Sequence, residues 1–540
     1  MAFDPIVVGS TFLALLAGCF LLDIIFVSNH DKTEPVYVRP SIPIVGHLIG
    51  IMRQHTEYFA HINFRLPTDL RGIFALPIGS FKMYIVTDRT LVPSIQRAAR
   101  TISFTPFSIR VNKAICELSD KAAEAHNNRS FMTEIKHAAV HGLSPGASLD
   151  QINLDTTNEQ LRIMNELTGR AATSSAGDTI DLVEWVQHVV SLSATRGFYG
   201  PLNPYSNPEH EKGFWAYNNK LAHIVANLLP NLTAGKALKS KEANGKRYEE
   251  YILNKGPDTA SRVVQDRTRI LEAHGFTLRE NALMNAGVDI ALLSNYAPTA
   301  FWAVFHALSD EKVLEGIREE LTASGAVSTS TTTDGETKHT LDISLLRTSC
   351  PLILSVLQEA QRFYTAHAHI REITADTTIS RTSGNTQPYL LKKGNYLQVA
   401  VKPTLRSPEI WGPDPDSFDP YRFMKLRNKD DPTSKLVKPS DLPANAFAVW
   451  GMAPHVCPAR QFASTGCVSL VALLALRFNF EPVDGTAEGG WKRPKPVTEL
   501  ASLQSPRGGC RVRVKPRSEG AGLWEAVVGT EGTKLPLAIA

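Results

Sequence analysis

The chain has 540 residues, with 57 Lys and Arg against 53 Asp and Glu and a formal net charge of +4, and 43% of its residues are hydrophobic. This composition supports a large globular core and excludes disordered, collagen-like and coiled-coil proteins. The near balance of charge gives no reason to expect a nucleic acid partner. Six scattered cysteines are too few for a disulfide framework, and no C-x-x-C or H-E-x-x-H pair suggests a zinc site.

The first predicted element is a mostly apolar run over residues 6–27, in which Asp23 is the only charged residue. As a helix it would span about 33 Å, enough for a bilayer core of about 30 Å. A cleaved signal peptide is disfavoured because the run is long and no basic segment precedes it, and a buried core helix is the other alternative. Basic residues such as Lys32 and Arg39 follow the run, which indicates a cytosolic C-terminal side. We therefore predict a single-pass membrane anchor over residues 1–30.

A proline-rich stretch over residues 31–47 follows the predicted anchor and contains Pro35, Pro40 and Pro43. Because proline fixes φ and lacks a backbone N–H, this stretch is predicted to be a stiff, extended hinge. No linker is visible between residues 48 and 540, so we predict a single large domain there.

Hydrophobic periodicity predicts helices over most of residues 85–370, including 278–309 and 341–364. The Ser- and Thr-rich residues 324–340 are predicted to form a surface loop. Strand-like runs come later, at Tyr389–Leu391, Tyr396–Val401 and Cys510–Val514. The predicted fold class is therefore mainly α with a smaller β portion.

A turn-prone segment containing Trp450 and Gly451 leads to Cys457, which is followed by Pro458 and an apolar helical run over residues 462–476. Proline is common in the first turn of a helix, so Cys457 is predicted to lie at or just before a helix N-terminus, where a thiolate is favoured. A lone thiolate suits a metal that brings its other ligands with it, as haem does. A buried structural cysteine and a nucleophilic cysteine are the alternatives for this residue alone.

This segment resembles the haem-binding signature of the cytochromes P450, F-G-x-G-x-R-x-C-x-G-R. Trp450 stands at the position of the Phe, and the other correspondences are Gly451, Cys457 and Arg460, with His455 at the first arginine and Ala453 and Ala459 at two glycines. Two more segments follow the family's order. Glu359 and Arg362 match the E-x-x-R of its K helix, and Arg422 matches the arginine of its P-x-R-F element.

The resemblance implies the cytochrome P450 fold, with one large catalytic domain after an N-terminal transmembrane helix, and haem b as cofactor. It implies that Cys457 binds the iron as a thiolate within a loop that includes Trp450 and Gly451. His455 and Arg371 would meet the haem propionates, although Arg371 has a surface charge as its alternative. The Glu359, Arg362 and Arg422 side chains would form a buried charge network.

The oxygen-activating helix departs from the family pattern A-G-x-[D/E]-T-[T/S]. Asn295 replaces the glycine, Ala297 the acid and Pro298 the threonine, and the proline is predicted to open the helical hydrogen-bond ladder. Asn295 and Thr299 are the polar groups left to orient water or substrate, and they are the predicted catalytic residues. The alternatives are a cap-like bond to the freed carbonyl and simple packing.

The pattern N-x-x-P-[A/T]-x-F-W resembles the branch that contains sterol 7α-hydroxylases and prostacyclin synthases. We predict a membrane-bound monooxygenase of the endoplasmic reticulum with a cytosolic catalytic domain, which oxidises a bulky apolar small molecule with O2. The general resemblance to fungal members implies a terpenoid, steroid-like or alkaloid intermediate of secondary metabolism. NADPH-cytochrome P450 reductase would be the electron donor and membrane lipid a further partner. The alternatives are an O2-independent isomerase or dehydratase that rearranges a peroxide, and a non-catalytic haem-binding membrane protein.

Overall fold

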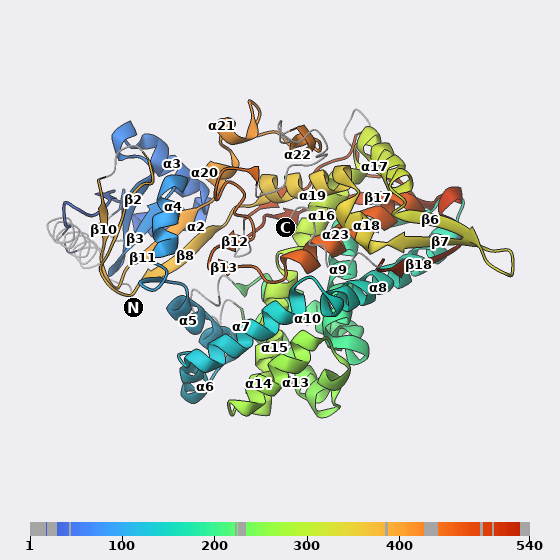
Figure 1. The fold of residues 1–540 in the computed structure, drawn as a ribbon, viewed down its shortest axis with the longest axis horizontal. Helices are drawn as coiled ribbons and strands as arrows, with labels where there is room; N and C mark the ends of the chain where they lie inside the picture. The colour runs from blue at the N-terminus through green and yellow to red at the C-terminus, as the bar shows by residue number, and fades with distance from the viewer. Residues whose placement is uncertain are drawn as a thin grey trace, which may run out of the picture. The chain divides into compact units, whose positions relative to one another are not determined.

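A computed structural model (Figure 1) describes residues 18, 30–42, 45–221, 224, 234–383, 387–425, 441–485, 490–498 and 502–529. The predicted membrane anchor lies, except for Gly18 and His30, outside these residues. Within them, no helix is both long and apolar enough to cross a membrane. The chain forms two compact units. Unit 1 comprises Met1–Ser108, Thr365–Pro415 and Pro443–Val456, and unit 2 comprises Ile109–Tyr364, Asp416–Leu442 and Cys457–Ala540.

Unit 1 is built on a six-stranded mixed sheet. The strands of unit 1 are β1 (Val36–Tyr37), β2 (Ile73–Ile78), β3 (Phe81–Val86), β4 (Ile102–Ser103), β8 (Ala368–Ile373), β9 (Thr377–Ile379), β10 (Tyr389–Leu391), β11 (Tyr396–Ala400), β12 (Gly451–Met452) and β13 (His455–Val456). Its helices are α2 (Gly46–Gln54), α3 (Glu57–Arg65), α4 (Val92–Arg97), α20 (Lys402–Leu405) and α21 (Pro408–Trp411). The main sheet has the order β1-β2-β3-β11-β8-β4, in which β1 runs parallel to β2 and β3 parallel to β11. Strand β2 is buried along its whole length, as an apolar strand of a covered sheet should be.

Part of the predicted hinge is built into this sheet. Strand β1 pairs in parallel with β2, and the buried Glu34 carboxylate accepts hydrogen bonds from Lys82 Nζ at 2.8 Å and from the Tyr84 hydroxyl at 2.6 Å. Helix α2 already begins at Gly46. The described part of residues 31–47 contains turns and bends beside the two-residue strand β1, it is tied to the sheet, and its last two residues are helical.

Unit 2 is mainly helical. Its helices are α6 (Asp120–Ala125), α7 (Arg129–Leu143), α8 (Ala147–Ala172), α9 (Leu182–Tyr199), α10 (Pro208–Asn218), α13 (Gly235–Leu253), α14 (Arg262–Ala273), α15 (Leu278–Leu293), α16 (Tyr296–Leu308), α17 (Glu311–Ala323), α18 (Ile343–Thr348), α19 (Pro351–Tyr364), α22 (Arg422–Lys425) and α23 (Arg460–Arg477), and α5 (Thr105–Cys116) enters it from unit 1. Its strands are β5 (Asp178–Asp181), β6 (Val327–Thr331), β7 (Thr337–Asp342), β14 (Phe478–Pro482), β15 (Lys495–Val497), β16 (Ser505–Arg507), β17 (Arg511–Pro516) and β18 (Leu523–Val527). The strands form sheets of order β14-β17-β5, β18-β7-β6 and β15-β16.

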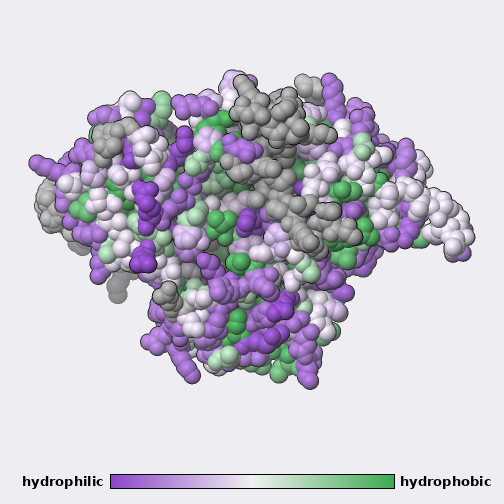
Figure 2. All heavy atoms as spheres, viewed as in Figure 1, coloured by the Kyte–Doolittle hydropathy of each residue, from purple (hydrophilic) through white to green (hydrophobic). Residues whose placement is uncertain are grey.

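Helix α16 lies at the centre of unit 2, where α9, α19 and α23 pack against it. All but one of its residues are buried, which explains why it is apolar on every side. Helix α14 lies at the surface instead. It buries Val263, Val264 and Leu271 and carries charged residues on its other side, so hydrophilic side chains predominate over this part of unit 2 (Figure 2).

The predicted fold class, mainly α with a smaller β portion, is confirmed. All three predicted strands are present within one or two residues, as β10, β11 and β17. The loop predicted at residues 324–340 is wrong, because β6 and β7 form a hairpin there, and the helix predicted at 341–364 begins only at Ile343 and is divided into α18 and α19. The reason is tertiary, since β18, nearly 200 residues later, supplies a parallel partner for β7.

The helix predicted at residues 278–309 is interrupted at residues 294–295, shortly before Pro298. Helix α15 starts at a Thr277–Glu280 capping box and ends at Leu293, and α16 starts at Tyr296. Pro298 has no N–H to donate to the carbonyl four residues earlier, and the ladder resumes with the Thr299 N–H bonded to the Asn295 carbonyl at 3.2 Å. The predicted opening of this helix is confirmed.

Candidate active site

A short hairpin in unit 1 leads into Cys457. Strand β12 pairs with β13, so that Gly451 faces Val456. Gly451 has φ +100°, and a Cβ there would lie 2.5 Å from the His455 carbonyl oxygen, so only glycine fits this turn. Cys457 follows directly and lies three residues before α23, which confirms its predicted position just before a helix N-terminus.

In the protein without haem, burial opposes the predicted preference of Cys457 for a thiolate. Burial raises the pKa of its thiol above the ordinary value, and the backbone N–H of Ala459 and the charge of Arg460 only partly offset that rise. Arg460 also donates to the Cys457 carbonyl at 3.2 Å, so its guanidinium is held close to this turn. A half-buried thiol of this kind gives up its proton when a metal cation coordinates the sulfur, because the cation replaces the lost solvation of the thiolate.

Helix α23, which starts after Cys457, packs closely on α16. The Phe462 ring lies 5.8 Å from the Tyr296 ring and 5.1 Å from the Phe198 ring. At Gly466 the two helices approach so closely that a Cβ would overlap the Tyr296 hydroxyl. The cysteine turn is therefore attached to the same packed core as the interrupted helix.

The two predicted catalytic residues are joined to each other at the start of α16. The Thr299 hydroxyl donates to the Asn295 carbonyl at 2.6 Å. The Asn295 side-chain oxygen Oδ1 accepts the backbone N–H groups of Ser502 at 2.8 Å and of Leu503 at 3.3 Å. Pro298 leaves the Ser294 carbonyl without its helical N–H donor. The Thr299 hydroxyl makes a cap-like hydrogen bond, but its acceptor is the Asn295 carbonyl and not the Ser294 carbonyl. Both side chains thus have structural partners.

Each of these side chains keeps one group for further interactions. The Nδ2 group of Asn295 has no hydrogen-bond partner within the part of the chain that the structure describes. The Thr299 oxygen, having donated its proton, still has lone pairs that can accept a hydrogen bond. Asn295 therefore offers a donor and Thr299 an acceptor.

The two predicted propionate-binding residues lie in unit 1 against one aromatic ring. The Arg371 guanidinium carbon is 5.4 Å from the centre of the Phe104 ring, and the His455 ring is 5.5 Å from it. Arg371 is buried, and burial lowers its pKa. Its one hydrogen bond within the described ranges goes from Nη1 to the Ile370 carbonyl at 2.7 Å, and no carboxylate among those residues neutralises it.

His369 is a residue that the sequence interpretation missed. It lies two positions before Arg371 on β8, is also buried, and has an Nε2 atom without a hydrogen-bond partner in the described residues. Burial, together with nearby His367 and Arg371, lowers the pKa of His369 to about 2, so the imidazole is neutral. The sequence pattern that could have identified His369 is the alternation of polar residues at 367, 369 and 371. Residues two apart share one face of a strand, so this pattern places His369 on the same face as Arg371.

These residues fit the group that the resemblance implies. A buried guanidinium without a counter-charge is costly, and a carboxylate-bearing group would relieve that cost. Within unit 1, Arg371 has this character, and the His369 Nε2 and the Trp450 Nε1–H are buried atoms without a hydrogen-bond partner among the described residues. In unit 2, Cys457 supplies a sulfur of the kind that binds haem iron.

The predicted charge network is confirmed in unit 2. The Glu359 carboxylate accepts Arg362 Nε at 2.7 Å and Arg362 Nη2 at 2.8 Å, and it also accepts Arg422 Nε at 3.0 Å. Both guanidinium groups donate to the Ser417 carbonyl as well. All three charged side chains are buried, and one carboxylate therefore holds two cations.

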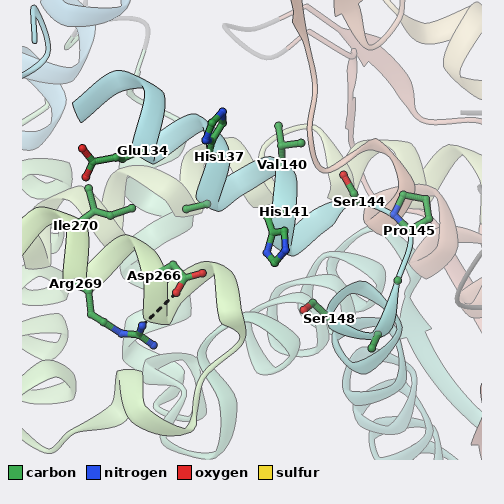
Figure 3. A pocket seen from close by; sticks show the side chains of 13 residues that line it. Glu134, His137, Val140, His141, Ser144, Pro145, Ser148, Asp266, Arg269 and Ile270 are labelled. Carbon is green, nitrogen blue, oxygen red and sulfur yellow. Dashed lines mark ion pairs between the residues drawn. The ribbon is translucent and has the colours of Figure 1, made fainter. Parts of the chain in front are cut away.

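A separate groove of about 840 Å³ lies in unit 2 between α7, α14 and the start of α8 (Figure 3). It contains none of the predicted site residues. Its histidines His137 and His141 lie one turn apart, but their rings point in opposite directions in Figure 3, and Asp266 pairs with Arg269 at 3.4 Å. In the described residues, no three His, Cys, Asp or Glu side chains are grouped to hold a metal ion. The groove is therefore not the predicted site.

Comparison with known proteins agrees with these observations. A family model described as cytochrome P450 matches residues 38–490. The chain belongs to the cytochrome P450 family. Similar proteins include cytochrome P450 monooxygenase nodJ of Hypoxylon pulicicidum (31% identical, covering 94% of this chain and 95% of the relative) and a cytochrome P450 monooxygenase of Gibberella zeae (26%, 93% and 90%). Another is cytochrome P450 monooxygenase poxD of Penicillium oxalicum (23%, 85% and 89%).

This cytochrome P450 is accordingly an oxidoreductase of the monooxygenase type, and its cofactor is haem bound through a cysteine thiolate. Enzymes of this type use O2, an organic substrate and a redox partner. Cysteine is the residue type that this chemistry requires, and Cys457 lies in the segment that carries the family signature.

Proposed function

We propose that this cytochrome P450 is a membrane-anchored monooxygenase that hydroxylates or otherwise oxidises a bulky apolar small molecule. The substrate class we propose is a terpenoid, steroid-like or alkaloid intermediate of secondary metabolism. Support comes from the relatives, which are monooxygenases of filamentous fungi by name and organism and match nearly the whole chain. The apolar run at residues 6–27 supports a single-pass anchor in the endoplasmic reticulum, with a cytosolic catalytic domain.

The proposed ligand of the haem iron is Cys457, and its position three residues before α23 is the observation that carries this proposal. Arg371 and His455 would hold the propionates, because both lie against Phe104 and Arg371 is a buried cation in need of an anion. Gly451 lets the hairpin turn tightly before the cysteine, and the Trp450 indole N–H has no acceptor within the described part of the chain. When bound, thiolate-ligated haem supplies the power to activate O2 for insertion into a C–H bond.

The proposed roles of Asn295 and Thr299 follow from the groups they keep. The Asn295 Nδ2 group would donate to a water or substrate oxygen, and the Thr299 oxygen would accept a hydrogen bond from the same water. In most family members a carboxylate in this helix delivers the proton. Neither Asn295 nor Thr299 is an acid, so in this protein a water would have to carry the proton. The bonds from Asn295 Oδ1 to the loop between β15 and β16 would hold the amide in one orientation.

The electrons would come from NADPH through a separate NADPH-cytochrome P450 reductase, since no G-x-G-x-x-G dinucleotide segment is visible in the sequence. A rearrangement of a peroxide without O2 is the second candidate, because Ala297 stands at the position of the acid and Pro298 at that of the threonine.

The deciding experiment is product analysis of microsomes that contain this chain, fed candidate metabolites under ¹⁸O₂ with and without reductase. A monooxygenase places one ¹⁸O atom in the product and requires both reductase and NADPH. Turnover that continues without reductase and introduces no ¹⁸O would refute the monooxygenase proposal in favour of rearrangement. A protein that shifts its spectrum on substrate binding but forms no product under any condition would be a haem-binding protein without catalysis.

A further inference from the structure

Three oxidisable or basic side chains of unit 2 form a connected group outside the residues that the proposed mechanism uses. The Trp302 indole and the Tyr364 phenol stack face to face, with ring centres 3.9 Å apart and an angle of 8° between their planes. The Tyr364 oxygen lies 2.9 Å from Nε2 of His306. Trp302 and His306 are one turn apart on α16, and Tyr364 is the last residue of α19.

The surroundings hold this group in one arrangement. Trp302 and Tyr364 are fully buried, and the Trp302 Nε1–H donates to the Gln504 carbonyl at 2.8 Å. The Phe418 ring lies parallel to the His306 ring at 3.5 Å and fixes its plane. Such parallel stacking within a rigid core brings the two π-systems into direct contact. Electron exchange between the indole and the phenol therefore needs no movement of either ring.

The hydrogen bond gives the phenol a place to send its proton. Burial lowers the pKa of His306 to about 3, so the imidazole is neutral and one of its ring nitrogens is a bare acceptor. We take the tautomer in which the Tyr364 O–H donates to the bare Nε2 of the neutral His306 imidazole. Loss of an electron from Tyr364 would then coincide with transfer of its proton over this short bond.

We propose that Trp302, Tyr364 and His306 form a redox relay. It removes oxidising equivalents from the active site when no substrate is present to react with them. When haem bound at the proposed site is oxidised by peroxide, the Trp302 ring would give one electron to it. Trp302 recovers that electron from Tyr364, whose O–H proton passes to Nε2 of His306. The result is a neutral tyrosyl radical and an imidazolium ion, with the oxidant reduced by one electron.

Delivery of one external electron to Tyr364 and return of the proton from His306 restore the resting relay. The inference rests on the proposed haem site, because the oxidant forms there. Trp302 lies only three residues after Thr299 on α16, a rise of about 4.5 Å along the helix. The entry point of the relay is thus on the same helix as the groups proposed to handle oxygen.

The test mixes ferric holoenzyme with peracetic acid in the absence of substrate and freezes the sample within milliseconds for electron paramagnetic resonance. Protein with ring-deuterated tyrosine distinguishes a tyrosyl from a tryptophanyl radical by its changed hyperfine pattern. We expect a tyrosyl signal in the wild type, its loss in Tyr364→Phe, and at least a fivefold smaller signal in His306→Gln. Glutamine still accepts the hydrogen bond but cannot hold the proton, so this variant separates proton transfer from packing.

Tyr296→Phe is the matched control. Tyr296 is also a buried tyrosine of α16, but its hydroxyl has no hydrogen-bond partner in the described residues, so its removal should leave the signal unchanged. Haem absorbance should bleach at least twofold faster with peroxide in Tyr364→Phe than in this control. A tyrosyl signal of full size in Tyr364→Phe, or none in wild-type protein with intact haem absorbance, would overturn the relay. A wild type that binds no haem would instead overturn the proposed haem site.

Discussion

The charge network of Glu359, Arg362 and Arg422 allows a quantitative prediction, because one buried carboxylate accepts hydrogen bonds from two buried guanidinium groups. Glu359→Gln keeps the shape and an acceptor oxygen but removes the negative charge to which both guanidinium groups donate. Breaking a buried ion pair in this way costs about 3–5 kcal/mol. Arg422→Met is milder, because the two bonds between Glu359 and Arg362 remain and their charges balance. It loses a charge-assisted hydrogen bond of about 1.5–3 kcal/mol.

The assay is urea unfolding of the purified holoenzyme, followed by tryptophan fluorescence and by haem absorbance, and evaluated where the two transitions coincide. Glu359→Gln should lower the free energy of unfolding by about 2 kcal/mol more than Arg422→Met. The control is Glu166→Gln, which removes an exposed ion pair with Arg162 and should change stability by less than about 0.5 kcal/mol. If Glu359→Gln is no more harmful than Arg422→Met, charge balance does not govern this network.

The remaining predictions concern the site, its pH dependence and the membrane. Cys457→Ala should abolish the red-shifted Soret band of the reduced carbon monoxide complex, whereas Cys467→Ala, a buried cysteine of α23, should retain it; a thiolate band in Cys457→Ala would contradict the ligand assignment. Asn295→Leu leaves two backbone N–H groups of the β15–β16 loop without their acceptor, so it should cost about 1–3 kcal/mol in urea unfolding, and an unchanged midpoint would show that the loop is held otherwise. Burial raises the pKa of Asp289 to about 7, and two tyrosine hydroxyls bond to it. The unfolded chain therefore loses this proton first, and the stability that the proton provides falls as the pH rises from about 4 to 7. Asp289→Asn should flatten this dependence in unfolding curves at a series of pH values, and an equally steep curve would contradict the argument. Deleting residues 1–30 should shift the protein from the microsomal pellet to the supernatant while the carbon monoxide spectrum persists; unchanged pelleting would assign the attachment to another surface.

Local chemistry explains why several features were predictable from the sequence. Proline lacks a backbone N–H wherever it occurs, so Pro298 predicts an interrupted helix whatever packs around it in the fold. The signature around Cys457 and the spacing of Glu359 and Arg362 likewise depend on residues close together in the chain, since residues three apart share one face of a helix. The mainly helical fold class follows from the same local periodicity.

What the sequence determined by itself about this protein was the chemistry of its short segments: a cysteine before a helix, an opened helix and a family signature. Tertiary structure alone decided which distant groups meet. The β6–β7 hairpin depends on β18, and the Asn295 side chain holds the loop at residues 502–503, some 200 residues away. The pKa of Cys457 rises because other parts of the chain bury it, which outweighs the local effect of the helix end. These outcomes depend on burial and on long-range hydrogen bonds, and neither is encoded in the spacing of neighbouring residues.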